Sequence, residues 1–233
     1  MSVGVTGSPR VGLKSFLTTL PLADREVVLT FDDGPFPPTT RRVLAALADE
    51  CVHATFFLIG QNAARSPELV RKIAADGHSI GYHTWSHGIL NRVGQNVAED
   101  EINRGIAAVE DITGKPTAPR TVGQTTAAGE PTRFFRFPGF ASTPRLLDEL
   151  NARNMVIFGA DLWASDWNKM TPDQELAQVV GRLKTARKGI ILFHDIKAQT
   201  AAMLPGFFRF LKDNGYHVVH VVPSGPALAD SGK

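Results

Sequence analysis

Short apolar runs alternate with amphipathic helical patterns along most of this chain, and that alternation limits the possible folds more than any other feature. The runs 27–31, 54–59, 190–193 and 216–222 are typical of buried strands. Helical patterns lie between such runs, for example after Thr171-Pro172, where a capping residue precedes a first-turn proline. Because a parallel strand needs a crossover that covers the sheet, the sequence predicts a parallel sheet packed against helices.

The number of repeats bears on whether the sheet is open or closed. About seven strand and helix units are present, and polar residues follow most of the predicted strands. An open sheet binds ligands mainly at one switch point, whereas a barrel brings all strand ends to one mouth. The pattern favours an α/β barrel, irregular or incompletely closed. We expect a single domain at 25–223, a poorly ordered or peripheral N-terminal tail at 1–24 and a C-terminal tail at 224–233.

Composition excludes several classes of protein. The chain has 233 residues, 43% of them hydrophobic, which suits one globular domain. Its net charge of +2 comes without a cluster of Lys and Arg, so we expect no nucleic-acid partner. The single cysteine, Cys51, excludes an internal disulfide and a thiolate metal cluster. No apolar run has the length of a membrane span, and we expect a monomer.

The first ten residues bear on localisation. They are rich in Gly, Ser and Val and lack the continuous apolar segment of a secretory signal. We interpret them as a tail left after removal of an export signal, in which case the protein is periplasmic or secreted. Without such a signal we expect it to be cytoplasmic.

Two adjacent carboxylates, Asp32 and Asp33, directly follow the first apolar run and are followed by Gly34 and Pro35. This order places them at the carboxyl end of a buried strand. Because successive residues leaving a strand point in different directions, one carboxylate can hold a metal while the other faces substrate. The alternative interpretation is an ordinary turn, in which Asp side chains cap backbone amides.

His83 and His87 form an HxxxH pair after another predicted strand. This spacing places two imidazoles on one side of a helical turn or tight loop. With Asp33 they would supply two nitrogens and one carboxylate oxygen, a set that suits Zn²⁺ and leaves a position open for water. Two loop histidines without a metal are the alternative.

The remaining histidines are weaker candidates. His194 differs from the others, since it ends an apolar strand on the same predicted face and is followed by Asp195. The others stand alone or within a strand pattern, and we interpret them as structural: His53, His78, His217 and His220.

Five motifs in order resemble those of the polysaccharide deacetylase family, the NodB-homology group of carbohydrate esterases. TFDDGP at 30–35 and HTWSH at 83–87 are similar to the first two. Arg136-Phe137-Pro138-Gly139, Asp166-Trp167 and Leu192-Phe193-His194 are similar to the other three. The motifs span most of the chain, and their order and spacing make a chance match improbable.

The resemblance implies a distorted (β/α) barrel and metal-dependent removal of N-acetyl groups from a sugar polymer such as peptidoglycan or chitin. It implies that Asp33, His83 and His87 bind Zn²⁺ or another divalent metal such as Co²⁺. It also implies that Asp32 is the catalytic base and His194 the general acid.

The resemblance extends to five supporting residues. It implies that Arg136 pairs with the base and that Asp166 orients the acid. Trp167 and Leu192 would line the acetyl pocket, and the backbone amide of Gly139 would stabilise the oxyanion.

Three features depart from the family pattern or extend it. An aromatic residue usually stands where this chain has Gly139, and we expect Phe140 to compensate. Asp161 is an alternative to Asp166 as the partner of the acid histidine. The long segment 115–132 is rich in Gly, Pro and Thr, and we expect it to border the substrate groove.

Other functions remain open on the sequence alone. Acetylated xylan is an alternative substrate, and the same fold can host hydrolysis of small non-sugar amides. A catalytically idle carbohydrate-binding module is disfavoured, because both acids and all three candidate site histidines are present. For a sugar groove, the candidate stacking residues are Trp85, Phe140 and Trp163.

Overall fold

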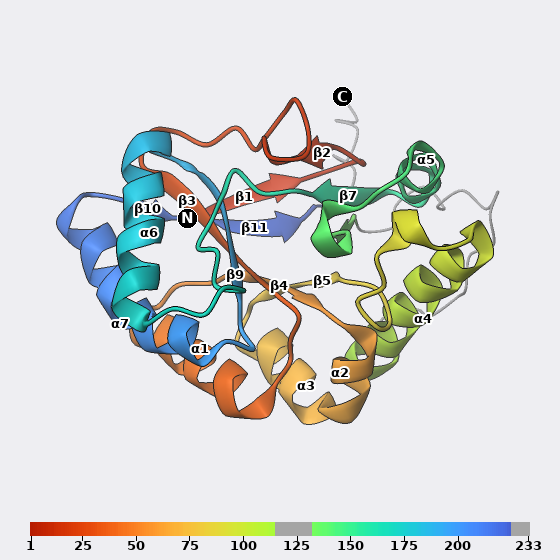
Figure 1. Ribbon diagram of the computed structural model, residues 1–233, viewed down its shortest axis with the longest axis horizontal. Coiled ribbons are helices and arrows are strands. Elements are labelled where there is room, and N and C mark those ends of the chain that lie inside the picture. The colour runs from red at the N-terminus through yellow and green to blue at the C-terminus, as the bar shows by residue number, and fades with distance from the viewer. Residues whose placement is uncertain (115–131, 225–233) are drawn as a thin grey trace, which may run out of the picture.

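A curled sheet of parallel strands forms the centre of the computed structural model, which describes residues 1–114 and 132–224 (Figure 1). The strand order is β2-β7-β6-β5-β4-β3-β9-β8, with no pairing between β8 and β2 to close it. The result is a half-barrel in a single domain, the distorted barrel predicted above. Its strands are β2 (Arg10–Val11), β3 (Glu26–Asp32), β4 (Thr55–Leu58), β5 (Ser79–Tyr82), β6 (Arg133–Phe135), β7 (Met155–Phe158), β8 (Leu162–Trp163) and β9 (Gly189–His194).

The strand count differs in detail from the seven expected. Two of the strands named above, β2 and β8, are only two residues long, too short for an apolar pattern to reveal. The run predicted as one strand at 216–222 divides into two. Its first part, β10 (His217–Val218), pairs with the start of β3, and its second part, β11 (His220–Pro223), pairs with β1 (Ser2–Val5) in a separate two-stranded sheet.

Helices surround the outer face of the sheet (Figure 1). The predicted capping box is present, because the Thr171 hydroxyl accepts from Gln174 N and the Gln174 side chain accepts from Thr171 N. The helices are α1 (Pro37–Asp49), α2 (Gly60–Arg65), α3 (Pro67–Ala75), α4 (Gln95–Thr113), α5 (Pro144–Ala152), α6 (Pro172–Ala186) and α7 (Ala198–Asp213), with short 3₁₀ turns at Leu90–Arg92 and Pro138–Phe140.

Alternation along β3 divides the core into two parts. Val27, Leu29 and Phe31 belong to the large cluster between sheet and helices. Val28 belongs to a smaller cluster that also holds the inward-facing Phe57. By the two-residue period of a strand, residues 30 and 32 face the interior with Val28. The last inward-facing position of β3 is therefore occupied by the Asp32 carboxylate rather than by an apolar side chain.

The N-terminal segment 1–24, expected to be a poorly ordered or peripheral tail, forms strands in both sheets. It contributes β1 to one sheet and β2 to the other, where β2 pairs with β7. Val5, Val11, Leu20 and Leu22 are buried in the inner cluster. These apolar residues are spaced too irregularly for a periodic pattern, but together they cover one end of the barrel interior. The division into a domain at 25–223 and two tails remains a prediction.

Two other predicted segments lie outside the described residues. They are the segment 115–132, of which only Thr132 is described, and the C-terminal tail, of which only Ser224 is described. Within the described part of the chain, no helix combines the length and the apolar character needed to cross a membrane.

Candidate active site

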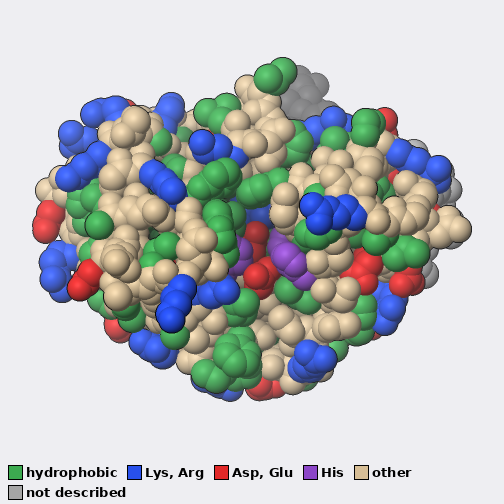
Figure 2. Space-filling model, viewed as in Figure 1, with side chains coloured by type: hydrophobic (Ala, Val, Ile, Leu, Met, Phe, Trp, Pro, Cys, Tyr) green, Lys and Arg blue, Asp and Glu red, His purple; other side chains and the backbone are tan. Residues whose placement is uncertain are grey.

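A pocket of about 370 Å³ opens at the carboxyl ends of the strands. In Figure 2 acidic and histidine side chains lie at the bottom of the hollow in the middle of the face shown. The pocket brings together eight of the ten predicted site residues, with three aromatic neighbours. Its lining is Asp32, Asp33, His83, His87, Phe137, Gly139, Phe140, Trp163, Trp167, Leu192 and His194.

The positions of the two proposed proton carriers follow from strand pairing. Asp32 at the end of β3 lies in register with His194 at the end of β9. The next residue, Asp33, leaves the strand with φ 76°, in the left-handed region, which turns its side chain away from that of Asp32. Asn62 holds this turn, because its Nδ2 donates to the Asp33 carbonyl at 2.8 Å. The two adjacent carboxylates have different main partners, although Asp32 Oδ2 and Asp33 Oδ1 lie 3.7 and 3.5 Å from His83 Nε2: Asp32 contacts Arg136, and Asp33 contacts His87.

Arg136 lies fully buried beneath Asp32. Its guanidinium donates to Asp32 Oδ1 at 2.7 Å, to Thr30 Oγ1 at 2.9 Å and to the Gly159 carbonyl at 2.7 Å. Burial raises the pKa of Asp32 above its ordinary value, although the Arg136 charge opposes this rise. An anionic group with a raised pKa, oriented by a fixed partner, suits a general base.

Asp33, His83 and His87, the predicted metal ligands, lie close together and could hold a metal ion. Asp33 Oδ1 lies 3.5 Å from His83 Nε2 and 3.3 Å from His87 Nε2. In a tetrahedral site with bonds of about 2.1 Å, neighbouring ligand atoms are about 3.4 Å apart. Asp33 Oδ1 is also buried without a hydrogen-bond partner among the described residues. A divalent cation would satisfy this oxygen, so the cluster fits such an ion in both spacing and chemistry.

The protonation of His83 suits a ligand. Its Nδ1 lies 2.7 Å from the Arg136 carbonyl, which can only accept, so Nδ1 carries the proton. The lone pair on Nε2 then points toward Asp33. Burial lowers the pKa of His83 to about 3, which keeps the ring neutral at physiological pH.

His194 has the opposite character. Burial lowers the pKa of His194, but the hydrogen bond from Nδ1 to Asp166 Oδ1 at 2.7 Å and the charges of Asp166 and Asp32 outweigh it and raise the pKa to about 9. The Asp166 carboxylate also accepts from the backbone N–H of His194 at 2.7 Å. His194 is therefore a protonated imidazole at neutral pH, with Nε2–H facing the pocket.

The structure distinguishes between Asp161 and Asp166, the two candidate partners of His194. Asp161 lies elsewhere, where its carboxylate accepts from Leu13 N, Thr19 Oγ1 and Ile190 N. It therefore fastens the N-terminal segment to β9, and Asp166 is the residue in contact with the imidazole.

An aromatic wall borders the pocket. Phe140 stacks on Trp163 with ring centroids 6.2 Å apart, and Trp163 in turn meets Trp167 edge-on at 5.9 Å. Phe140 thus stands in the wall beside Gly139, as expected from the altered motif. Trp85 does not line this pocket, since the Arg104 guanidinium covers its ring at 4.5 Å.

Sequence reasoning missed four residues that support the site: Thr30, Asn62, Glu175 and Thr200. The sequence could have indicated Thr30, because it is a polar residue on the same inner face of β3 as Val28. It could also have indicated Glu175, because this residue occupies a core-facing position of α6 together with Val179. Asn62 and Thr200 act through contacts that no local pattern indicates.

Comparison with known proteins agrees with this geometry. Residues 20–157 match the family model described as polysaccharide deacetylase. A peptidoglycan-N-acetylglucosamine deacetylase of Bacillus cereus is 35% identical over 201 residues, which cover 81% of this chain and 66% of that protein. The peptidoglycan-N-acetylmuramic acid deacetylase PdaC of Bacillus subtilis is 30% identical over 84% of this chain and 38% of that protein.

A solved structure gives the same result. The Bdellovibrio bacteriovorus peptidoglycan deacetylase Bd3279 superposes with a TM-score of 0.80 at 29% identity, over 100% of this chain and 60% of that one. The chain belongs to the polysaccharide deacetylase family, whose members named here are hydrolases of carbon-nitrogen bonds. It spans about two thirds or less of the length of these relatives.

Proposed function

We propose that this protein is a metal-dependent deacetylase that removes N-acetyl groups from an N-acetylglucosamine-type polysaccharide of the peptidoglycan or chitin kind. The observation that carries the proposal is the convergence of three groups in one pocket: a carboxylate with two imidazoles, a second carboxylate paired with a buried arginine, and a protonated imidazole. Deacetylation requires a Lewis acid, a base and an acid.

Asp33, His83 and His87 would hold Zn²⁺ or another divalent ion. When bound, such an ion polarises the amide carbonyl and lowers the pKa of water. The chain's own contribution is the fixed orientation of the three ligand atoms, all of which lie within 4.8 Å of one another.

Asp32 would accept a proton from the attacking water. Its Oδ1 is held by Arg136, and its Oδ2 lies 3.7 Å from His83 Nε2, beside the ligand cluster. The new bond joins the water oxygen to the acetyl carbon, and the N–H group of Gly139 at the pocket wall would donate to the oxygen that becomes negative.

His194 would complete the reaction by donating the Nε2 proton to the sugar nitrogen as the carbon-nitrogen bond breaks. Without that proton the departing amine would be too basic to leave. Acetate and a free amino sugar result. Asp166 stabilises the protonated ring, which supports this assignment.

Two features support a glycan substrate. The aromatic wall of Phe140, Trp163 and Trp167 offers apolar faces that suit a pyranose ring and an acetyl methyl group. The relatives named above are peptidoglycan deacetylases, so a cell-wall polymer, met outside the cytoplasm, is the substrate class we favour.

Acetate release tests the proposal. The substrates are peptidoglycan, chitooligosaccharides, acetylated xylan and simple amides, each with and without added Zn²⁺ after chelation, and His194→Gln is the control variant. We expect release from an N-acetylated glycan that depends on the metal and on His194. Release only from acetylated xylan or only from simple amides would replace the proposed substrate, and binding without release would make the protein a binding module.

A further inference from the structure

A buried acid outside the pocket is not used by the mechanism above. Glu175 lies on α6, and its side chain is 0% exposed. Core-facing positions of a helix are normally apolar, and the next two on this face are Val179 and Leu183. A carboxyl group at such a place is costly unless it is paired or neutral.

The contacts of Glu175 lead directly to the site. Thr200 Oγ1, on α7, lies 2.9 Å from Glu175 Oε1 and 2.9 Å from Asp166 Oδ2. Asp166 is the carboxylate that contacts His194. The four side chains thus form one continuous hydrogen-bonded row from the interior of the helix layer to the pocket.

The number of protons sets the direction of these bonds. The Thr200 hydroxyl has one hydrogen and can donate to only one of its two carboxyl neighbours. Asp166 contacts the protonated imidazole, which favours its ionised form, and an ionised carboxylate is a stronger acceptor than a neutral carboxyl, so the hydroxyl donates to Asp166. The contact between Thr200 Oγ1 and Glu175 Oε1 then needs a proton on Glu175.

The surroundings of Glu175 favour that neutral form. In the described part of the chain no Lys or Arg forms an ion pair with it, and its Oε2 has no hydrogen-bond partner. Burial, together with the nearby charge of Asp166, raises the pKa of Glu175 to about 7. A second ionised carboxylate on the same hydroxyl would repel Asp166.

We propose that Glu175 is a positioning residue for the reaction: as a neutral carboxyl it donates to Thr200, which donates to Asp166 and so holds that carboxylate against His194. This inference rests on the proposed deacetylase function only for its kinetic readout. It assigns Glu175 no contact with substrate or metal.

Three variants test the row. Thr200→Val removes the hydroxyl at nearly constant volume, and Glu175→Ala removes the carboxyl. Glu175→Gln keeps a donor toward Thr200. The matched controls are Thr55→Val, a buried threonine whose hydroxyl has no partner in the described structure, and Glu110→Gln, a buried acid that instead accepts from Tyr82 at 2.8 Å.

We expect Thr200→Val and Glu175→Ala to lower kcat about tenfold, the effect of one hydrogen bond to a charged group, with KM and metal content unchanged. Glu175→Gln should retain wild-type kcat, and so should both controls. Unchanged kcat in Thr200→Val and Glu175→Ala overturns the proposal. If Glu175→Gln and Glu175→Ala lose kcat equally, Glu175 does not act as a neutral donor to Thr200.

Two spectroscopic measurements need no substrate. The Nδ1–H proton of His194 should give a downfield NMR signal that is kept in Glu175→Gln and shifted in Thr200→Val. The infrared spectrum below pH 7 should contain a protonated-carboxyl band that is absent in Glu175→Gln. If the two spectra are the same in this region, Glu175 is not protonated and the proposal is wrong. If these signals behave as expected in a protein that deacetylates nothing, the proposed function fails while the positioning role stands.

Discussion

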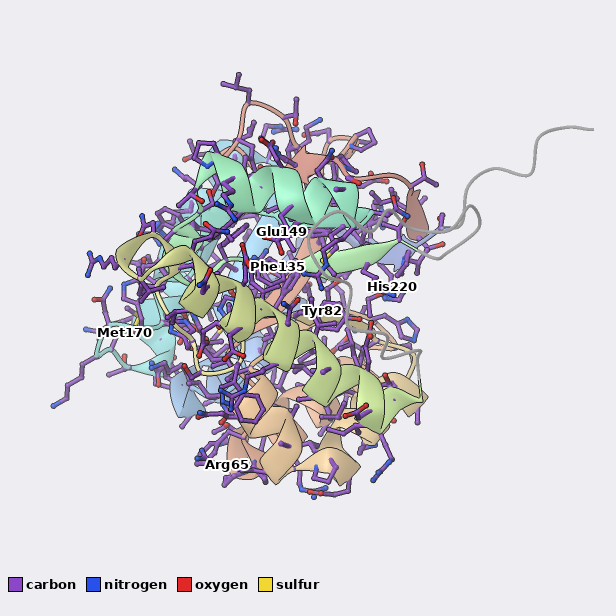
Figure 3. All side chains as sticks on the ribbon, turned by 90° about the vertical axis from the view of Figure 1, so that its right-hand side faces the viewer. Arg65, Tyr82, Phe135, Glu149, Met170 and His220 are labelled. Carbon is purple, nitrogen blue, oxygen red and sulfur yellow. The ribbon has the colours of Figure 1, made fainter. Side chains whose placement is uncertain are left out.

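The two histidine clusters at opposite ends of the sheet have similar ring spacing and different chemistry. The site histidines are His83, His87 and His194, and the opposite-end histidines are His53, His78 and His220. The rings of His83 and His87 lie 5.1 Å apart, and those of His53 and His220 lie 5.2 Å apart. In Figure 3 the labelled His220 lies on the opposite side of the molecule from Met170, which is in the same β8–α6 connection as the pocket residue Trp167.

Carboxylates account for the difference. The site histidines contact two carboxylates. Asp33 Oδ1 lies 3.5 Å from His83 Nε2 and 3.3 Å from His87 Nε2, and Asp166 keeps His194 protonated. At the opposite end, Ala54 N donates to His78 Nδ1, and His220 Nε2 pairs with the Ser79 hydroxyl. Burial and the neighbouring imidazole of His53 lower the pKa of both His78 and His220 to about 4. Closely spaced imidazoles therefore form a reactive site only where anions converge on them.

The largest expected effect separates the two aspartates of the site. Asp32→Asn should retain the metal and lower kcat by roughly 10² to 10⁴-fold, the usual contribution of a general base. Asp33→Asn should weaken metal binding, and activity should partly return at high Zn²⁺. Steady-state kinetics with metal analysis measure both, and His220→Asn serves as the control with unchanged kcat. If both Asp variants lose metal equally and recover equally, Asp32 is a ligand or a turn residue.

Metal content distinguishes the clusters next. His83→Ala and His87→Ala should each lower the affinity for Zn²⁺ by at least about 100-fold, more than the loss of an outer-shell group. His53→Ala and His78→Ala should leave it unchanged, since no carboxylate joins that cluster among the described residues. Elemental analysis after dialysis provides the measurement. Wild-type content in both site variants would refute the ligand assignment.

Acid stability should depend on the opposite-end histidines. His78 and His220 have folded pKa values of about 4, below the ordinary histidine value of 6.5, so the unfolded chain binds more protons between these values. Stability should fall as pH falls from 6.5 to about 4. We expect each of the two histidines to lower the free energy of unfolding by about 1 kcal/mol over this pH range, after allowance for partial exposure. Denaturant unfolding of His78→Gln/His220→Gln over this range should give a flatter profile.

His194 should act in the opposite direction. Its folded pKa of about 9 means that its stabilisation is complete below 6.5 and is lost as pH rises through 9. The His78→Gln/His220→Gln variant should still lose stability as pH rises through 9. It should also keep the loss of stability at low pH that comes from protonation of His83. A flat acid limb in the wild-type protein would show that the opposite-end cluster is not held neutral.

The smallest expected effect concerns Ser79. Its hydroxyl donates to the Val221 carbonyl at 2.6 Å and meets His220, which joins β5 to β11. Ser79→Ala should lower the free energy of unfolding by about 1 kcal/mol and leave kcat and metal content unchanged. A measurable loss of metal would mean that the two ends of the sheet are coupled.

Local patterns predicted the parts of the fold and site that depend on local chemistry. The apolar run before Asp32 and the HxxxH pair each place reactive groups at a strand end without help from distant residues. The identification of Arg136 and Asp166 depended on the family resemblance, because their contacts are long-range. Arg136 reaches Asp32 across 104 positions of the chain, a separation at which spacing carries no information.

The strands that local patterns did not reveal have a common physical cause. β2 has only two residues and is held by pairing with β7, and the apolar side chains of 1–24 are buried by neighbours far along the chain. No periodicity marks such a segment. Glu175 was overlooked for a different reason. The pattern of α6 predicts an amphipathic helix whichever residue stands at position 175, and the role of the acid depends on its contact with Thr200, which lies on another helix.

The register of β3 against β9 has a consequence for how this enzyme family can be altered. Asp32 and His194 are paired positions of neighbouring strands, so main-chain hydrogen bonds set the distance between the two groups that we propose as base and acid. Phe140 and Trp167, which shape the wall, lie on connections outside that pairing. On the proposed mechanism, the spacing of base and acid is set separately from the wall that would select the substrate. We therefore expect that exchanging these connections would change the preferred acylated glycan while Asp32 and His194 stay in place.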